Sequence, residues 1–193
     1  MVKKPGHLPR LDPGFYQGRA WVHWTMSMRD RATGWLDETF HRDFRELLQH
    51  AQSRYHLHCP AYCLMPDHFH LLWMGLWEGS DQLKAARFLR RHLNRLLAVS
   101  GATLQPQGHD RVLRKPEQER DAFEDAVLYV FRNPERAGLV GEWRDWPFAG
   151  AMACGYPELP VWPTGEFFRR FWIVHHREIR RFDGEEMDGE MEA

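Results

Sequence analysis

The sequence predicts an α+β protein in which helices pack on one face of a largely antiparallel sheet. Three observations support this class. The 193 residues are 43% hydrophobic and 27% charged, a balance that lets one domain bury a core without disulfides or a structural metal. Segments with the periods of strands and helices alternate along the chain. Two strand-like segments are separated by only two residues, which predicts a hairpin and therefore antiparallel pairing.

The first part of the chain predicts an arm, a strand and a helix. Residues 1–14 hold three prolines and two glycines among mostly polar neighbours, which is typical of an extended arm. Residues 19–28 are rich in aromatic and β-favouring side chains and predict the first strand. Over 37–55, apolar residues recur every three or four positions, as on one face of an amphipathic helix. These residues are Phe40, Phe44, Leu47, Leu48 and Ala51.

A hairpin and a long helix follow. Residues 57–65 and 68–75 have β-type composition, and the Pro66-Asp67 pair between them is typical of a turn. Residues 81–99 then show the clearest helical pattern of the chain, which a glycine ends. The apolar side of this helix consists of Leu83, Ala86, Leu89, Leu93, Leu96 and Leu97.

The second half of the chain is less regular. Residues 103–114 are short and polar, which predicts a loop with a short strand at most. Pro116 opens a helix in the favoured first-turn position, and Asn133-Pro134 interrupts that helix. A segment rich in Trp, Pro and Gly then leads to a last helix over 165–181. The order strand, helix, strand, strand, helix, possible strand and helix is typical of a ferredoxin/RRM-like sheet.

Charge and cysteine content limit the partners and the compartment. The formal net charge is −1, but six acids and no bases stand in the last eleven residues. Without them the bases outnumber the acids by five, which is compatible with a polyanionic partner without requiring one. The chain starts without an apolar signal segment, and no apolar run is long enough for a membrane span. Three cysteines in a chain that needs no disulfides favour the reducing cytoplasm.

Two histidines stand at the start of the second hairpin strand. Because alternate residues of a strand share a face, His68 and His70 point the same way, about 7 Å apart along the chain, while Phe69 and Leu71 point to the core. Two such imidazoles can hold one metal ion, although a pair of half-exposed histidines is the more common meaning of this spacing. Two ligands are too few for a closed structural site, so we expect a third ligand and open positions for water or substrate.

The helix that follows Pro116 carries a large ring away from its apolar side. At about 100° per residue, Tyr129 lies well away from the centre of that side, and Asn133 lies one turn further along nearly the same face. The tyrosine offers a phenolic nucleophile, and the asparagine offers an amide oxygen for a hard cation. A partly buried aromatic residue beside a helix cap is the alternative interpretation. The apolar side consists of Phe123, Val127, Val130 and Phe131.

Two motifs together resemble a known family. Residues 61–72 read Ala-Tyr-Cys-Leu-Met-Pro-Asp-His-Phe-His-Leu-Leu, and residues 128–140 read Leu-Tyr-Val-Phe-Arg-Asn-Pro-Glu-Arg-Ala-Gly-Leu-Val. In this order, and with a helical segment between them, they resemble the single-tyrosine HUH transposases, in particular the branch associated with repetitive extragenic palindromes. The resemblance extends over about residues 15–150.

The resemblance implies a metal-dependent DNA strand transferase. In the family, the two histidines of the strand bind a divalent cation, usually Mg²⁺ or Mn²⁺, and the tyrosine attacks DNA. Carried to this chain, these residues are His68, His70 and Tyr129, with Asn133 completing the metal site. The implied product is a covalent 5′-phosphotyrosine link, which a 3′ hydroxyl reverses without ATP. Asp67 replaces an expected asparagine, and it either anchors an imidazole from outside the ligand shell or caps the turn.

Substrate binding is expected on the helix over 81–99. Basic residues recur every three or four positions opposite its leucine side, and such a row can follow several phosphates. A solvated basic face without a DNA role is the alternative. Because the family acts on single-stranded or hairpin DNA, DNA of that kind is the expected partner. The predicted DNA-binding residues are Lys84, Arg87, Arg90, Arg91, Arg95, Arg111, Arg114 and Lys115.

This interpretation divides the chain into four segments. We expect an extended arm over 1–14, a transposase-like catalytic domain over 15–150, an extension with a helix over 151–182, and an acidic disordered tail over 183–193. The extension either packs on the sheet or adds a second DNA contact. The chain works as a monomer, or as a homodimer if Tyr129 belongs to the site of a partner.

Two other functions stay open. A non-catalytic nucleic-acid-binding module on the same scaffold would keep the basic helix without the chemistry. A metal-dependent phosphodiesterase would use His68 and His70 to activate water, and it would keep its turnover after Tyr129→Phe. A strand transferase would lose cleavage with this substitution and keep DNA binding.

Overall fold

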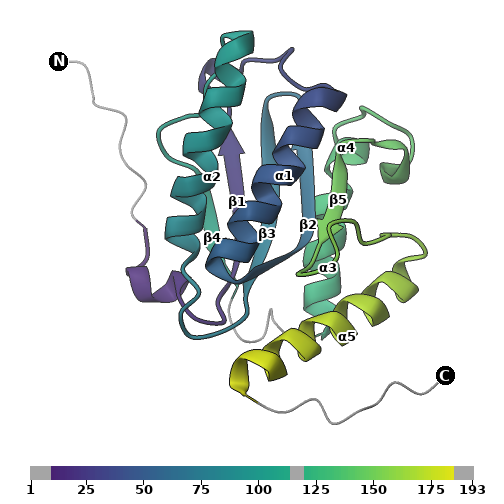
Figure 1. Cartoon of the computed structure of the whole chain (residues 1–193). Coiled ribbons are helices and arrows are strands. Elements are labelled where there is room, and N and C mark those ends of the chain that lie inside the picture. Colours follow the sequence, from purple (N-terminus) through teal and green to yellow (C-terminus); the bar gives the residue numbers. More distant parts are fainter. Residues whose placement is uncertain (1–9, 114–119, 185–193) are drawn as a thin grey trace.

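Five strands form one antiparallel sheet in the order β4-β1-β3-β2-β5 (Figure 1). The structure is a computed structural model that describes residues 10–113 and 120–184. The predicted α+β class with an antiparallel sheet is confirmed. The strands are β1 (Trp21–Ser27), β2 (Leu57–Met65), β3 (His68–Gly75), β4 (His109–Val112) and β5 (Ala149–Met152).

Two long helices connect the first four strands. α1 joins β1 to β2 and α2 joins β3 to β4, which gives the ferredoxin-like βαββαβ unit. None of the helices in the described parts of the chain is long and apolar enough to cross a membrane. The helices are α1 (Glu38–Tyr55), α2 (Gln82–Leu97), α3 (Arg120–Phe131), α4 (Asn133–Arg136) and α5 (Thr164–Asp183). Short 3-10 turns are η1 (Pro13–Tyr16), η2 (Arg29–Arg31), η3 (Ala98–Ser100) and η5 (Trp143–Asp145).

Local signals in the sequence explain where α1, α2 and the hairpin begin and end. The carboxylate of Asp37 accepts a hydrogen bond from the first turn of α1, and that of Asp81 does the same for α2. The left-handed backbone of Gly101 follows the end of α2 and η3. The hairpin closes with Met65 opposite His68, as the two-residue turn predicts.

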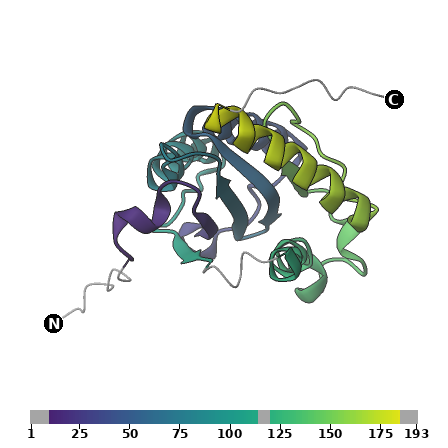
Figure 2. The same ribbon diagram turned by 90° about the horizontal axis from the view of Figure 1, so that it is seen from below.

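Helices cover both faces of the sheet, whereas the sequence predicted helices on one face. α1 and α2 pack on the face that includes Trp24 and Phe69. α3 and α5 pack on the opposite face, against Leu72 and Met74. Figure 2 shows the sheet between α2 and α3. The reason is that β2 carries apolar side chains on both of its faces, and covering both faces buries all nine of its residues.

The segment after α4 contains a strand that the sequence did not predict. β5 pairs with β2 at the edge of the sheet, and its sequence Ala-Gly-Ala-Met has neither β-branched residues nor alternation. α5 occupies the place of the predicted last helix and packs Phe167, Phe168 and Phe171 on the sheet, as one of the two expected roles of this extension. Expectations for 1–9, for Pro116 and for the tail beyond 184 lie outside the described residues.

Candidate active site

β3 presents its two histidines on the face of the sheet that α3 covers. Phe69 and Leu71 belong to the apolar cluster beneath α1 and α2, and Leu72 belongs to the cluster beneath α3 and α5. The alternation of the strand therefore places His68 and His70 on the α3 side. His70 is buried, with 6% of its surface exposed, and His68 is partly exposed beside the turn.

The two imidazoles face each other through their Nε2 atoms, which lie 3.1 Å apart. The Nδ1 atom of His68 lies 2.6 Å from one carboxylate oxygen of Asp67, and Arg31 donates to the other oxygen at 3.0 Å. Burial alone would raise the pKa of Asp67, but the hydrogen bond to His68 and the charges of His68 and Arg31 outweigh it and lower that pKa. The Asp67 anion therefore assigns the proton of His68 to Nδ1 and directs the Nε2 lone pair toward His70.

β1 provides contacts to the other nitrogen of His70. The Nδ1 atom of His70 lies 3.1 Å from Nε2 of His23 and 3.2 Å from the hydroxyl oxygen of Thr25. Thr25 is the residue directly opposite His70 in the β1–β3 ladder. Either group can accept a hydrogen bond from Nδ1–H, which would keep the proton of His70 on Nδ1 and leave Nε2 with its lone pair. Sequence reasoning missed both contacts, because they depend on β1 and β3 being neighbours.

Tyr129 of α3 lies beside these imidazoles. The centre of its ring is 6.5 Å from the ring centre of His70 and 5.9 Å from that of His23, edge-on in both cases. Its neighbours Phe123 and Val127 point into the apolar cluster, while 45% of the Tyr129 surface is exposed. The phenol is therefore close to the histidine pair and also accessible from solvent.

The break after α3 places two further side chains around Tyr129. The amide nitrogen of Asn133 donates to the carbonyl oxygens of Tyr129 at 2.8 Å and Val130 at 3.2 Å, and so caps the end of α3. α4 then turns the chain so that the guanidinium carbon of Arg136 lies 4.6 Å from the centre of the Tyr129 ring. Because the side-chain nitrogen of Asn133 donates these two hydrogen bonds, the side-chain oxygen is the atom that could bind a cation. Sequence reasoning did not select Arg136.

His70, which is buried, and His23, which is partly buried, are neutral at pH 7. Burial lowers the pKa of His70 to about 3, with the charges of His23, His68 and Arg136 acting in the same direction. Burial, Arg111 and His109 lower the pKa of His23 to about 4. The neutral imidazole is the form that binds a metal ion.

The histidine pair is suited to two ligand positions of a divalent cation. Two nitrogen ligands at right angles on one cation, each about 2.1 Å from it, would lie about 3.0 Å apart. The 3.1 Å between the two Nε2 atoms is close to this separation. Within 10–113 and 120–184, no group of three or more His, Cys, Asp and Glu residues is arranged to hold a metal. A cation bound by this pair would therefore keep open positions for water or a phosphate oxygen.

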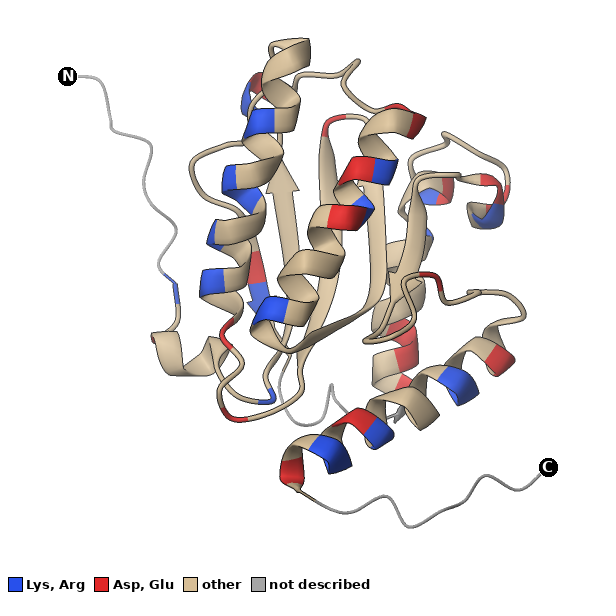
Figure 3. Ribbon diagram, viewed as in Figure 1, with Lys and Arg blue, Asp and Glu red and all other residues tan. Residues whose placement is uncertain are grey.

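The basic row of α2 lies on the opposite face of the sheet from Tyr129. The Lys and Arg positions of α2 are blue in the ribbon of Figure 3, and four of these residues are exposed. α2 belongs to one apolar cluster and α3 to the other, so the row and the histidine pair do not line one cleft. The row and the histidine pair are separated because helices cover both faces of the sheet. The exposed members of the row are Lys84, Arg87, Arg91 and Arg95.

The other predicted DNA-binding residues have different surroundings. Arg90 is partly buried and donates to the carbonyl oxygen of Gln105 at 2.6 Å, and burial, together with Arg10, lowers its pKa. Arg111 lies opposite His23 in the β1–β4 ladder, on the face that carries Tyr129. Arg114 and Lys115 lie outside the described residues.

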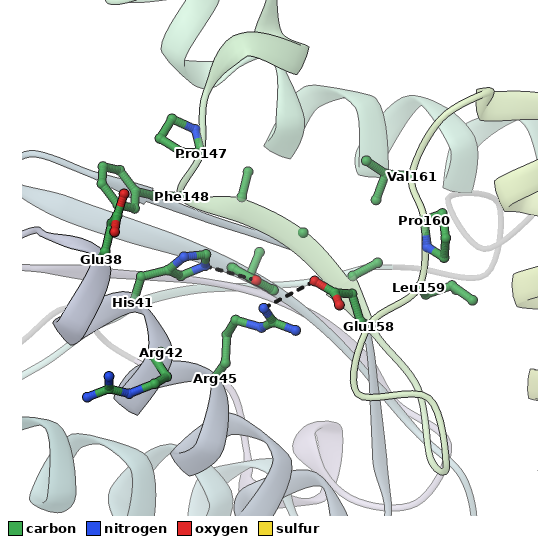
Figure 4. Close-up of a pocket in the computed structure, with 14 residues that line it drawn as sticks. Glu38, His41, Arg42, Arg45, Pro147, Phe148, Glu158, Leu159, Pro160 and Val161 are labelled. Atoms are coloured by element: carbon green, nitrogen blue, oxygen red, sulfur yellow. Dashed lines mark hydrogen bonds and ion pairs between the residues drawn. The ribbon is translucent and has the colours of Figure 1, made fainter.

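Two cavities flank the sheet. The first, of about 450 Å³, opens between α3 and β4 and has Tyr129 in its wall. The second, of about 500 Å³, lies between α1 and β5 (Figure 4) and contains none of the predicted site residues. In this second cavity, Arg45 pairs with Glu158 at 3.3 Å and His41 lies 3.0 Å from the hydroxyl of Tyr62. Two of its charged residues, Arg45 and Glu158, are therefore paired with each other.

Comparisons with known proteins agree with the resemblance. No protein-family model matches the chain. The chain is 24% identical over 140 residues to the REP-associated tyrosine transposase of Escherichia coli (strain K12), a match that covers 70% of this chain and 78% of that protein. The resemblance found from the two motifs is therefore confirmed.

A solved structure gives the same result for the fold. The structure of a REP-associated tyrosine transposase bound to a REP hairpin matches with a TM-score of 0.61 and 20% sequence identity. The match covers 74% of this chain and 82% of the other. The α+β fold is therefore shared with that protein.

Proposed function

We propose that this chain is a metal-dependent DNA strand transferase that cleaves and rejoins single-stranded or hairpin DNA through Tyr129. The observation that carries the proposal is the 6.5 Å between the ring centres of Tyr129 and His70, two residues far apart in the sequence. The similarity to a tyrosine transposase supports this chemistry, and the hairpin bound by the solved neighbour supports hairpin DNA as the substrate.

In the proposed reaction, Tyr129 loses its proton and its phenolate oxygen attacks the scissile phosphorus in line. The bond from phosphorus to the 3′ oxygen breaks as the new bond forms, and the departing oxygen takes up a proton as a 3′ hydroxyl. The other DNA end stays attached through a 5′-phosphotyrosine link. Attack by a second 3′ hydroxyl reverses these steps and returns the proton to Tyr129. Because a phosphodiester is replaced by a phosphodiester, rejoining needs no ATP.

His68 and His70 are the proposed ligands of the divalent cation, Mg²⁺ or Mn²⁺, with the oxygen of Asn133 as the third. When bound, the cation neutralises charge on the scissile phosphate. Asp67 positions the imidazole of His68 from outside the ligand shell, in agreement with the 2.6 Å contact between them. Arg136 is a further proposed contact for a phosphate oxygen, because its guanidinium lies over the Tyr129 ring.

The proposed site is complete within one chain. The nucleophile and both histidines come from the same molecule, so a monomer suffices and a homodimer is not required. Arg111 would contact the strand near the reacting phosphate, because it shares a face with Tyr129. The α2 row would contact a different part of the DNA. A DNA-processing role and three free cysteines fit the cytoplasm.

The test uses an end-labelled hairpin oligonucleotide with single-stranded arms, incubated with the full chain and Mg²⁺ or Mn²⁺. On a denaturing gel, a strand transferase gives a labelled band attached to protein. Tyr129→Phe should abolish this band and keep DNA binding. Tyr156→Phe is the matched control, because Tyr156 is also exposed and lies outside the proposed site.

Each other result would replace the proposal with a different function. Free fragments that persist in Tyr129→Phe would show a phosphodiesterase that uses His68 and His70 to activate water. Bound DNA that stays uncut with every cation would show a binding module. A protein-linked band that persists in Tyr129→Phe would assign the nucleophile to another residue.

A further inference from the structure

The cavity between α3 and β4 has a wall of small side chains next to the proposed nucleophile. Ala122 and Ala126 lie one turn apart on α3, and Tyr129 follows on the same side of the helix. The short alanines leave a space of about 450 Å³, which is within the range of sites that hold small organic molecules. A base adjoining the phosphate at Tyr129 could therefore enter this space.

The polar groups of the cavity differ in charge between its two walls. Asp125 on α3 lines one wall, and its carboxylate can accept hydrogen bonds but cannot donate them. His109 and Arg111 on β4 provide nitrogen atoms on the other wall. A carboxylate repels a DNA phosphate but attracts an amino group of a nucleobase. The wall of Asp125 therefore suits a base, whereas the backbone phosphates suit the side of Arg111 and Arg136.

From this arrangement we infer that the cavity binds one unstacked nucleobase next to the scissile phosphate, and that Asp125 selects a base with an exocyclic amino group. Cytosine presents an amino group at position 4, and thymine presents a carbonyl oxygen at the same place. Thymine would place its O4 atom, a hydrogen-bond acceptor, against the carboxylate of Asp125, which is also an acceptor, and the two would repel each other. The inference rests on the proposed function in one respect: it takes the ligand to be a DNA strand.

The test measures binding without cleavage. Fluorescence anisotropy of the full chain is recorded without divalent cations, using labelled short oligonucleotides of deoxycytidine and of deoxythymidine. The wild-type protein should bind the deoxycytidine strand about fivefold or more tightly. Asp125→Asn should bring this ratio close to one, because an amide both donates and accepts. Asp121→Asn makes the same change of charge in an exposed residue of α3 outside the cavity, and should keep the ratio.

A second variant tests the space itself. Ala122→Leu should fill part of the cavity and lower the ratio, with circular dichroism confirming the fold. A wild-type ratio of one, or a ratio that changes equally in Asp125→Asn and Asp121→Asn, would overturn the inference. Because no cleavage is needed, the two proposals can fail separately. The protein could, for example, prefer cytosine, lose this preference only in Asp125→Asn and never form the covalent product. That result would support the nucleobase pocket and reject the proposed strand-transferase activity.

Discussion

The Nε2 atom of His23 lies 3.1 Å from the Nδ1 atom of His70, on neighbouring strands of the sheet. This contact, with Thr25 as an alternative acceptor at 3.2 Å, can hold the His70 proton on Nδ1 and leave Nε2 for a cation. We therefore expect His23→Leu to weaken Mn²⁺ binding about tenfold or more. The double variant His23→Leu/Thr25→Val should weaken it further, because both acceptors are then lost. Isothermal titration calorimetry measures the affinity.

His50→Leu provides the control for this prediction, because His50 is an exposed histidine on α1. Its Mn²⁺ affinity should equal that of the unmodified chain. Thermal unfolding of each variant shows whether the fold is intact. An unchanged affinity in a folded double variant would show that neither β1 residue positions His70.

Arg136 should contribute to the reaction through its position over Tyr129, where the guanidinium carbon lies 4.6 Å from the ring centre. A charged hydrogen bond to a phosphate oxygen next to the phenol would favour the transition state. Arg136→Gln should slow formation of the protein–DNA adduct about tenfold or more, and Arg136→Lys should have a smaller effect because it keeps the charge. Single-turnover gel assays measure the rate. Arg132→Gln, an exposed residue one turn earlier, should react at the normal rate.

Much of the sheet was predictable because local rules set it. The hairpin of β2 and β3 follows from a two-residue turn, and α1 and α2 follow from periodic apolar residues and capping aspartates. β5 was not predictable, since the sequence Ala-Gly-Ala-Met forms a strand only because the edge of β2 is available. Coverage of both faces of the sheet by helices is likewise a tertiary feature, although β2, in which His58 is the only ionisable imidazole among otherwise mostly apolar residues, indicated it.

The candidate site shows the same division. The motifs selected His68, His70 and Tyr129, and the chain brings these residues to one face of the sheet. His23 could be found only from the pairing of β1 with β3, which the strand pattern leaves open. Arg136 stands within the second motif, but its contact with Tyr129 depends on the turn at Asn133. The separation of the α2 row from the site also required the three-dimensional arrangement.

Two neighbouring arginines of α2 should give different results when replaced. Arg91 is exposed, so Arg91→Gln should weaken binding to a hairpin and lower the slope of log affinity against log salt by about one, with little change in stability. Arg90 donates to the carbonyl oxygen of Gln105, so Arg90→Gln should lower the free energy of unfolding by about 1 kcal/mol. Salt titrations and urea unfolding measure these effects. An unchanged salt slope in Arg91→Gln would remove this residue from the DNA interface.

A buried histidine pair should make the fold sensitive to acid. His58 of β2 and His175 of α5 lie with their Nδ1 atoms 3.3 Å apart, and both are almost fully buried. Burial, with Arg177, lowers the pKa of His58 to about 3, and burial, with His58, His176 and Arg19, lowers that of His175 to about 3. Because these folded-state pKa values lie below the ordinary value near 6.5, the unfolded chain binds more protons between pH 6.5 and pH 3.

The stability contributed by the neutral pair is therefore complete above about pH 6.5 and is lost as the pH falls toward 3. At pH 5 the free energy of unfolding should be lower than at neutral pH by about 2 kcal/mol for each of the two imidazoles. The double variant His58→Leu/His175→Phe removes both titrating groups and should reduce the loss of stability between pH 7 and pH 5 by about 4 kcal/mol. His50→Gln, which replaces an exposed histidine on α1 outside this pair, should follow the parent chain. Urea unfolding at both pH values decides the matter: an equal loss in the double variant and the parent would assign the acid sensitivity to other groups, such as His23 and His70.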